Sequence, residues 1–277
     1  YSQPIHGQYT FRELSKHLYC RKDLPGTIPY RTLYYNKDWA FCVTVEQYER
    51  IEDASGPYEV VIDSEFKKGS LSTGELLIKG TSSREFLLST YICHPSLAND
   101  NLSGTLLTAF LARYLDSKTH ITNNYRIVFA PETIGAITYC AHNLAALDSI
   151  DCGFVISCVA GPGRLGYKQA FDKNHHLNRL VEDVLRRYDE NFMSYPFDIH
   201  GSDERQYSSP GIGINIVSIV KDKYYEYPYY HTSLDNLDFI QAEHLLTTLH
   251  AYIDVIEQLE QDIYYRRQNP ECEAMLS

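Results

Sequence analysis

From residue 86 onward, short apolar runs alternate with amphipathic segments, and this alternation limits the possible folds more than any other feature of the chain. The apolar runs have the composition of strands buried on both faces of a sheet, and they are residues 86–93, 125–130, 152–159 and 212–220. Segments with apolar residues at helical spacing lie between and after them, at 102–115, 134–144, 175–191 and 241–265. This order predicts an α/β fold in which helices flank a mixed, mostly parallel central sheet.

The first 80 residues have a different pattern. Residues 8–20 have the spacing of a helix, and two prolines and a glycine follow them. Residues 31–80 contain three short strand-like runs, AFCVTV, EVVIDS and ELLIKG, separated by polar turns and without a convincing long helix. We therefore expect residues 31–80 to form a small β-rich inserted subdomain, and residues 1–30 and 81–277 to form the main α/β domain.

The charge balance excludes some classes of partner. Asp plus Glu number 36 and Lys plus Arg number 25, which gives a net charge of -11. Nucleic-acid-binding proteins usually carry a basic surface, so we expect no nucleic acid partner. No stretch approaches the roughly 20 apolar residues of a membrane span, so we expect no membrane partner. The seven cysteines form no CxxC pair and lie partly in apolar runs, which favours reduced thiols and a cytoplasmic location.

Candidate reactive side chains lie in the loops next to the predicted strands. His94 and Asp100 follow the first strand, Glu132 follows the second, Asp203 precedes the last strand and His231 follows it. Ligands of open α/β sheets gather beyond the carboxyl ends of the strands, and imidazoles with carboxylates suit zinc. Each residue alone has an ordinary explanation, such as a helix cap for Asp100 or a buried imidazole for His94. Together they favour a metal site.

Several motifs also carry a family resemblance. ICHPSLANDNLSG, SDERQYSSPGI and YYHTSLDN resemble the zinc-binding turn, the Ser-Asp loop and the closing metal-histidine loop of the clan MH zinc aminopeptidases. The chain is more similar still to a bacterial aminopeptidase-like subgroup often found beside polysaccharide-biosynthesis genes. The resemblance spans nearly the whole chain, including its N-terminal part, and it implies a zinc-exopeptidase-like fold.

The resemblance implies a role for each candidate residue. His94, Asp100 and His231 would be the zinc ligands, Glu132 would be the catalytic base or a fourth ligand, and Asp203 would contribute from its loop. The resemblance also implies a strained or cis peptide bond after Asp100.

The chain departs from the family pattern at three places. Ser96 stands where the family has the aspartate of a His-x-Asp motif that begins at His94. Pro131 stands where the family has the first of two consecutive glutamates, and Ser157 and Cys158 stand where an aspartate ligand is usual. We therefore expect one zinc ion and leave a second open.

These observations favour a zinc-dependent hydrolase of the aminopeptidase type. Its substrate would be a short peptide or a small amide bound in a tyrosine-lined pocket, and a homo-oligomer is compatible with the sequence. Two alternatives stay open. One is a metal-binding protein without peptidase activity, because of the missing acids. The other is zinc-dependent acyl transfer or deacylation at the same site.

Overall fold

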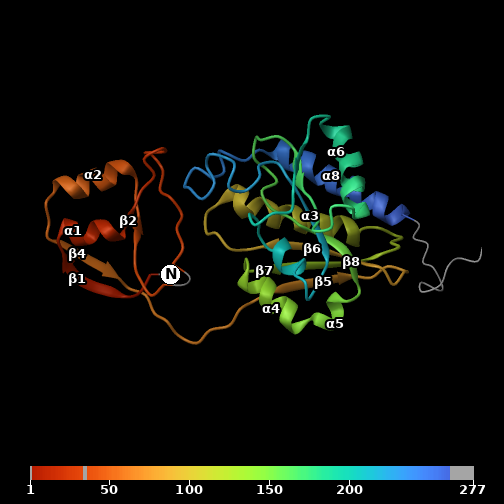
Figure 1. The fold of residues 1–277 in the computed structure, drawn as a ribbon, viewed down its shortest axis with the longest axis horizontal. Coiled ribbons are helices and arrows are strands. Elements are labelled where there is room, and N and C mark those ends of the chain that lie inside the picture. The colour runs from red at the N-terminus through yellow and green to blue at the C-terminus, as the bar shows by residue number, and fades with distance from the viewer. Residues whose placement is uncertain (1, 34–35, 263–277) are drawn as a thin grey trace, which may run out of the picture.

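The computed structural model describes residues 2–33 and 36–262 of the 277-residue chain. It has a small N-terminal lobe and a larger α/β domain, joined by an extended segment at residues 63–73 (Figure 1). None of the helices in the described part of the chain has the length and apolar character needed to cross a bilayer.

The small lobe combines two short sheets with two helices. Strand β1 (Ile5–Tyr9) pairs antiparallel with β4 (Tyr58–Ile62), and β2 (Leu18–Tyr19) pairs parallel with β3 (Phe41–Cys42). Helix α1 spans Phe11–Leu14, a 3₁₀ turn spans Ser15–His17, and α2 spans Val45–Asp53. The lobe has its own apolar core, which consists of the buried residues Leu14, Leu18, Trp39 and Val60.

The lobe boundaries correct the expected 31–80 insertion. Residues 5–9 belong to the small lobe through their pairing with 58–62, and β5 (Gly74–Ile78) is an edge strand of the main sheet. Residues 8–20 form a strand end, a single helical turn and a 3₁₀ turn rather than one helix. Helix α2 was not expected. Thr44 is its N-cap residue and forms a capping box, a local signal that the spacing of apolar residues does not show.

The main sheet has seven strands in the order β10-β9-β11-β8-β6-β7-β5. Its four central strands, β11, β8, β6 and β7, run parallel, whereas β9 and β5 run antiparallel to their inner neighbours. The remaining strand bounds are β6 Glu85–Tyr91, β7 Asn124–Ala130, β8 Ile150–Val155, β9 Gly166–Lys168, β10 Met193–Tyr195 and β11 Asn215–Val220. The four predicted strands and the mixed, mostly parallel sheet are therefore confirmed. The three-residue strands β9 and β10 were not expected.

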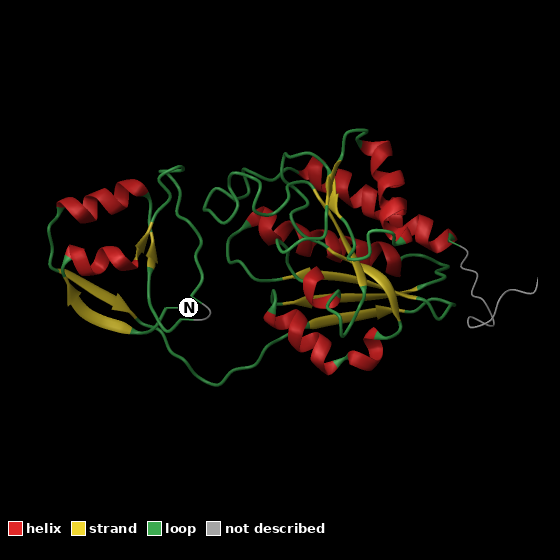
Figure 2. Cartoon of the chain, viewed as in Figure 1, coloured by secondary structure: helices red, strands yellow, loops and turns green. Residues whose placement is uncertain are grey.

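Helices cover both faces of this sheet (Figures 1 and 2). One face packs against α3 (Gly104–Asp116), α6 (His176–Tyr188) and α8 (Ala242–Gln261). The other face packs against α4 (Ile134–His142), α5 (Leu144–Leu147) and α7 (Glu204–Tyr207). The expected closing helix at 241–265 is confirmed as α8, although residues 263–265 lie outside the described residues.

The turn between β6 and α3 brings two backbones unusually close. A Cβ atom on Gly104 would lie 2.3 Å from Asn101 Oδ1 and 2.4 Å from the carbonyl oxygen of Ile156, which follows β8. Only glycine therefore allows the first turn of α3 to approach β8 at this distance. The close approach holds the turn at residues 98–103 against the carboxyl edge of the sheet.

We predict that Gly104→Ala destabilises the fold by about 1–3 kcal/mol, because the added methyl group overpacks this contact. The measurement is urea unfolding followed by circular dichroism. Gly211→Ala is the matched control, since no heavy atom lies within 4 Å of a Cβ built there. Equal unfolding midpoints for the two variants would contradict the packing argument.

Candidate metal centre

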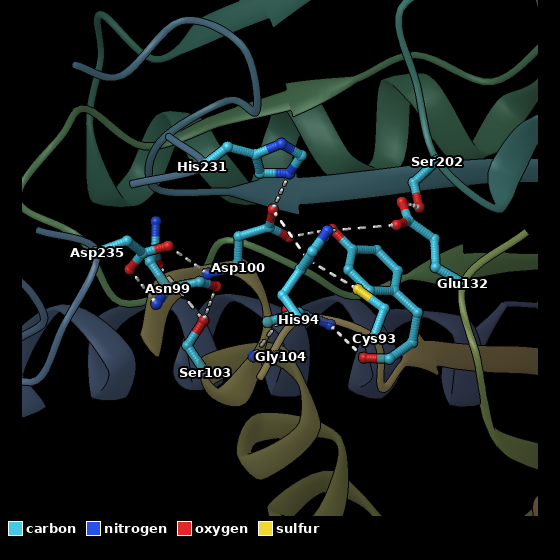
Figure 3. A network of polar contacts seen from close by, with 12 residues as sticks. Cys93, His94, Asn99, Asp100, Ser103, Gly104, Glu132, Ser202, His231 and Asp235 are labelled. Atoms are coloured by element: carbon cyan, nitrogen blue, oxygen red, sulfur yellow. Dashed lines mark hydrogen bonds and ion pairs between the residues drawn. The ribbon is translucent and has the colours of Figure 1, made fainter. Parts of the chain in front are cut away.

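The structure brings the three predicted ligands together. His94 follows β6, Asp100 lies in the turn before α3, and His231 lies in the loop after β11. Donor atoms of the three side chains all lie within 4.8 Å of one another. Asp100 Oδ2 is 3.4 Å from His94 Nδ1 and 3.2 Å from His231 Nε2, so the two imidazoles flank one carboxylate oxygen (Figure 3). Their role as metal ligands remains a prediction.

The hydrogen-bond partners of these atoms provide a test of whether a cation fits. Asp100 Oδ2 and His231 Nε2 are buried, and neither makes a hydrogen bond within the described part of the chain. A buried carboxylate oxygen without a partner costs free energy, commonly more than 1–3 kcal/mol for a charged group. A divalent cation between the imidazoles would compensate both atoms. Nitrogen and oxygen donors at this spacing fit zinc.

The rest of Asp100 is firmly held. The hydroxyl of Tyr91 donates a hydrogen bond of 2.7 Å to Asp100 Oδ1. The carboxylate of Asp235 accepts the backbone N–H groups of Asn99 and Asp100, at 2.6 and 3.0 Å. Tyr227 donates its hydroxyl to Asp235 Oδ2 at 2.9 Å, so this second carboxylate is itself oriented. These bonds leave Oδ2 as the oxygen of Asp100 that faces the imidazoles.

Asn101 fixes the turn from the other side. Its amide nitrogen donates to Thr90 Oγ1 and to the carbonyl of Tyr91, both at 3.0 Å, and its oxygen accepts the N–H of Gly104. The peptide bond between Asp100 and Asn101 is cis, as the family resemblance implied.

A second group of polar side chains also contacts His94, and one of them is close to the same ring nitrogen as Asp100. Cys93 Sγ is 2.8 Å from His94 Nδ1, and Glu132 Oε2 is 3.9 Å from His94 Nε2. Cys93, His94 and Glu132 thus offer a second set of donors within 4.8 Å of one another. The hydroxyl of Ser202 donates to Glu132 Oε1 at 2.8 Å, which leaves Oε2 facing the imidazole. Cys93 ends the apolar run 86–93 and was not among the predicted site residues, although its place directly before His94 was a usable signal.

Asp203 lies next to this group but belongs to neither donor cluster among the described residues. It directly precedes α7, and its Oδ1 accepts the backbone N–H of Thr133 at 2.7 Å. The pKa of Asp203 is raised to about 8, mainly by burial and also by the nearby Glu132 carboxylate, while the Thr133 N–H opposes the shift. A carboxyl group with this pKa holds its proton at neutral pH.

A buried charge pair anchors the loop that carries Ser202 and Asp203. Lys168 Nζ lies 3.0 Å from Glu204 Oε1, and both side chains are almost fully buried. Glu204 also accepts the backbone N–H of Ser202 and the hydroxyl of Tyr224. The sequence analysis did not find this pair, because Lys168 lies on the short strand β9 and no local pattern links it to residue 204.

Four residues around the centre adopt left-handed backbone conformations although they are not glycine. Their φ angles are 66° for Ser96, 60° for Thr133, 54° for Cys158 and 54° for His231. Such conformations cost about 1–3 kcal/mol and persist where the surrounding structure enforces them, often at functional sites. All four lie in loops at the carboxyl edge of the parallel strands, the edge that carries the predicted ligands.

The cavity beside His94 differs from the tyrosine-lined pocket that we expected. It has a volume of about 440 Å³, and among the described residues of its wall Tyr91 is the single tyrosine. Tyr30 instead packs edge-on against the imidazoles of His94 and His231, with ring centroids 4.8 and 5.3 Å away, and Tyr230 stacks on His231 at 3.9 Å. The aliphatic side chains of the cavity wall are Ile92, Leu97, Ala98, Leu102 and Leu237.

Residues 24–262 match the model of a protein family described as Domain of unknown function (DUF4910). A Clostridium acetobutylicum protein, whose name describes a polysaccharide biosynthesis protein with an aminopeptidase-like domain, is 40% identical over 276 residues. The match covers 100% of this chain and 63% of the relative, so the chain spans less than two thirds of the relative's length.

Solved structures share the fold. A Clostridium acetobutylicum protein named as a candidate peptidase matches with a TM-score of 0.90 and 39% identity, over 100% of this chain and 64% of that one. A zinc aminopeptidase from Bacillus subtilis matches with a TM-score of 0.57 and 19% identity, over 68% and 49%. A glutaminyl cyclase from Porphyromonas gingivalis matches with a TM-score of 0.57 and 14% identity, over 68% and 78%. The zinc-exopeptidase-like fold is therefore confirmed.

We predict that Asp203→Asn changes how stability depends on pH. The folded pKa of Asp203, about 8, lies above its ordinary value of 3.8, so the native state binds the proton more tightly than the unfolded state. The free energy of unfolding of the wild type should therefore fall as pH rises from about 4 to about 8, by up to about 1.4 kcal/mol per pH unit from this group. The variant should lack this contribution.

Urea unfolding of both proteins in metal-free buffer at pH 5 and pH 8 tests the prediction. The variant should gain stability relative to the wild type as the pH rises. Parallel pH profiles for the two proteins would show that Asp203 carries no raised pKa.

Proposed function

Because the chain belongs to the DUF4910 family and has a zinc-exopeptidase-like fold, we propose that it is a zinc-dependent hydrolase of the aminopeptidase type. Its substrate would be a short peptide or a small amide. The observation that carries the proposal is the unpartnered Asp100 Oδ2, which the imidazoles of His94 and His231 flank.

His94, Asp100 and His231 would hold the zinc ion. When bound, zinc supplies Lewis-acid chemistry at the oxygen of the scissile carbonyl. The donor set supports one ion, because the acids that would hold a second ion are replaced by Pro131, Ser157 and Cys158. This arrangement gives the chain a catalytic centre with few protein ligands, as hydrolytic zinc sites have.

Glu132 would move the proton. Its Oε2 lies 3.9 Å from His94 Nε2, whereas Ser202 holds its Oε1 through a hydrogen bond. In the proposed reaction Glu132 accepts a proton from the attacking water as the water oxygen bonds to the carbonyl carbon. Glu132 then delivers this proton to the amine nitrogen as the carbon–nitrogen bond breaks. Asp203, with its raised pKa, would stay protonated beside Glu132 and limit repulsion between the two acids.

The cavity beside His94 favours a small substrate with an apolar group. Its wall is largely aliphatic, and its volume of about 440 Å³ lies at the small end of ligand sites. We further propose that the protein acts in the cytoplasm, because its cysteines form no CxxC pair and lie partly in apolar runs. We also propose that it binds no nucleic acid, because its net charge is -11, and no membrane, because no stretch approaches the roughly 20 apolar residues of a span. A homo-oligomer is compatible with this proposal.

Acyl transfer or deacylation at the same centre is a second candidate. One observation favours it: Glu132 stands alone where the resembling aminopeptidases have two glutamates, so the proton-transfer machinery differs from theirs. The fold itself also occurs in a glutaminyl cyclase. An activity assay of the zinc-loaded protein separates the candidates. Its substrates are aminoacyl anilides, N-acyl sugars and N-terminal glutaminyl peptides. Zinc binding without turnover of any of them would favour a metal-binding protein without peptidase activity.

We predict that Glu132→Gln retains zinc but loses most turnover, because an amide cannot accept the proton. Positioned acid–base groups contribute about 10²–10⁴-fold to rate, so a loss in that range is expected. The measurement is zinc content and rate on the same sample across a zinc titration. Glu190→Gln, a substitution of an exposed glutamate, is the control and should behave like the wild type.

Two other results would change the assignment of Glu132. Weakened zinc affinity, with activity partly restored by added zinc, would make Glu132 a ligand rather than the base. Full zinc content with undiminished turnover would remove Glu132 from both roles.

A further inference from the structure

Cys93 occupies an unusual position for a packing residue. Its sulfur lies 2.8 Å from His94 Nδ1, and it shares a set of donors within 4.8 Å with His94 and Glu132 (Figure 3). Three other cysteines of the α/β domain, at 140, 152 and 158, are fully buried, whereas Cys93 is partly exposed and contributes to the wall of the cavity beside His94. A cation or a small molecule entering that cavity can therefore reach this thiol.

The chain also has fewer acidic donors around the centre than the pattern it resembles. Neither Pro131 nor Ser157 can replace a carboxylate ligand, and Cys158 belongs to no donor cluster among the described residues. A zinc ion held by His94, Asp100 and His231 would receive one negative charge from its protein ligands. Thiolate is a strong zinc ligand, and a thiol that coordinates zinc loses its proton.

We propose that Cys93 is a further ligand of this metal centre and binds the ion as a thiolate. The inference rests on the proposed zinc site. On binding, the S–H bond breaks, the proton passes to solvent, and a sulfur–metal bond replaces the contact between Cys93 and His94 Nδ1. The centre then combines sulfur, nitrogen and oxygen donors. Soft thiolate donors favour zinc and the chemically similar ions cobalt and cadmium over magnesium and calcium.

The competing explanation is that Cys93 only packs. It packs against the apolar cluster on the second face of the sheet, a cluster that includes Tyr91 and Val155. A packing thiol and a ligating thiol differ in one directly measurable way, since only the ligand forms a sulfur–metal bond. Cobalt(II) is a suitable probe because thiolate coordination gives a charge-transfer band in the near ultraviolet, whereas nitrogen and oxygen ligands alone give only the weaker visible bands.

The experiment is a cobalt titration of the metal-free protein, followed by absorption from the near ultraviolet through the visible. We expect the wild type to show both the thiolate band and the visible bands. Cys93→Ser should keep the visible bands, lose the thiolate band, and bind cobalt more weakly by at least the roughly 10- to 100-fold that loss of an outer-shell partner causes. Cys20→Ser, in the small lobe, is the matched control and should keep the thiolate band.

A second measurement on the wild type avoids any folding defect of the variant. Zinc should slow alkylation of Cys93 by iodoacetamide, as followed by mass spectrometry, and leave alkylation of Cys20 unchanged. Visible cobalt bands without a thiolate band, or unprotected Cys93 in the zinc-loaded protein, would overturn the inference and leave the proposed function intact. Absence of every cobalt band would contradict both the inference and the proposed zinc site.

Discussion

The structure of this centre depends on one buried carboxylate. Asp100 is 1% exposed, and a charge in such a place is stable only if its surroundings compensate it. Tyr91 satisfies one oxygen, whereas the other faces two imidazoles that come from distant parts of the chain. A divalent cation bound between them would compensate it fully, and the geometry of the surrounding turns is consistent with that role.

The fold supports this arrangement through groups that do not belong to the centre. Asp235 holds the backbone of the turn before α3, and the Lys168–Glu204 pair holds the loop of Ser202 and Asp203. Both anchors are buried, so loss of one partner would leave an uncompensated polar group. The small lobe also contributes. Tyr30 donates its backbone N–H to the carbonyl of His231, and its ring packs against both imidazoles.

Much of this arrangement could be predicted from the sequence, for identifiable physical reasons. The central strands are buried on both faces and therefore appear as continuous apolar runs, and polar residues directly after such runs must lie at one edge of the sheet. That reasoning was enough to bring His94, Asp100, Glu132 and His231 together. Asp203 precedes its strand rather than following it, so this reasoning does not apply to it, and the structure separates Asp203 from both donor clusters.

Other features of the structure could not be predicted from local sequence patterns. The pairing of residues 5–9 with 58–62 and the placement of β5 at the edge of the main sheet depend on long-range contacts between short, half-exposed strands. The Lys168–Glu204 pair joins residues 36 positions apart, and burial of two opposite charges is rarely visible in a hydrophobic pattern. The expected tyrosine-lined pocket is a further case. Several tyrosines of residues 224–230 pack against one another and against Phe239, and Tyr230 stacks on His231.

The central claim is that His94, Asp100 and His231 bind one zinc ion. A crystal structure of the zinc-loaded protein, with anomalous difference maps collected on both sides of the zinc absorption edge, tests it most directly. The account predicts a single strong peak among the three side chains, with zinc–nitrogen distances of about 2.0–2.1 Å and a zinc–oxygen distance of about 2.0–2.2 Å. Zinc bound elsewhere on the chain, or imidazoles of His94 and His231 that turn away from each other in the loaded protein, would contradict it.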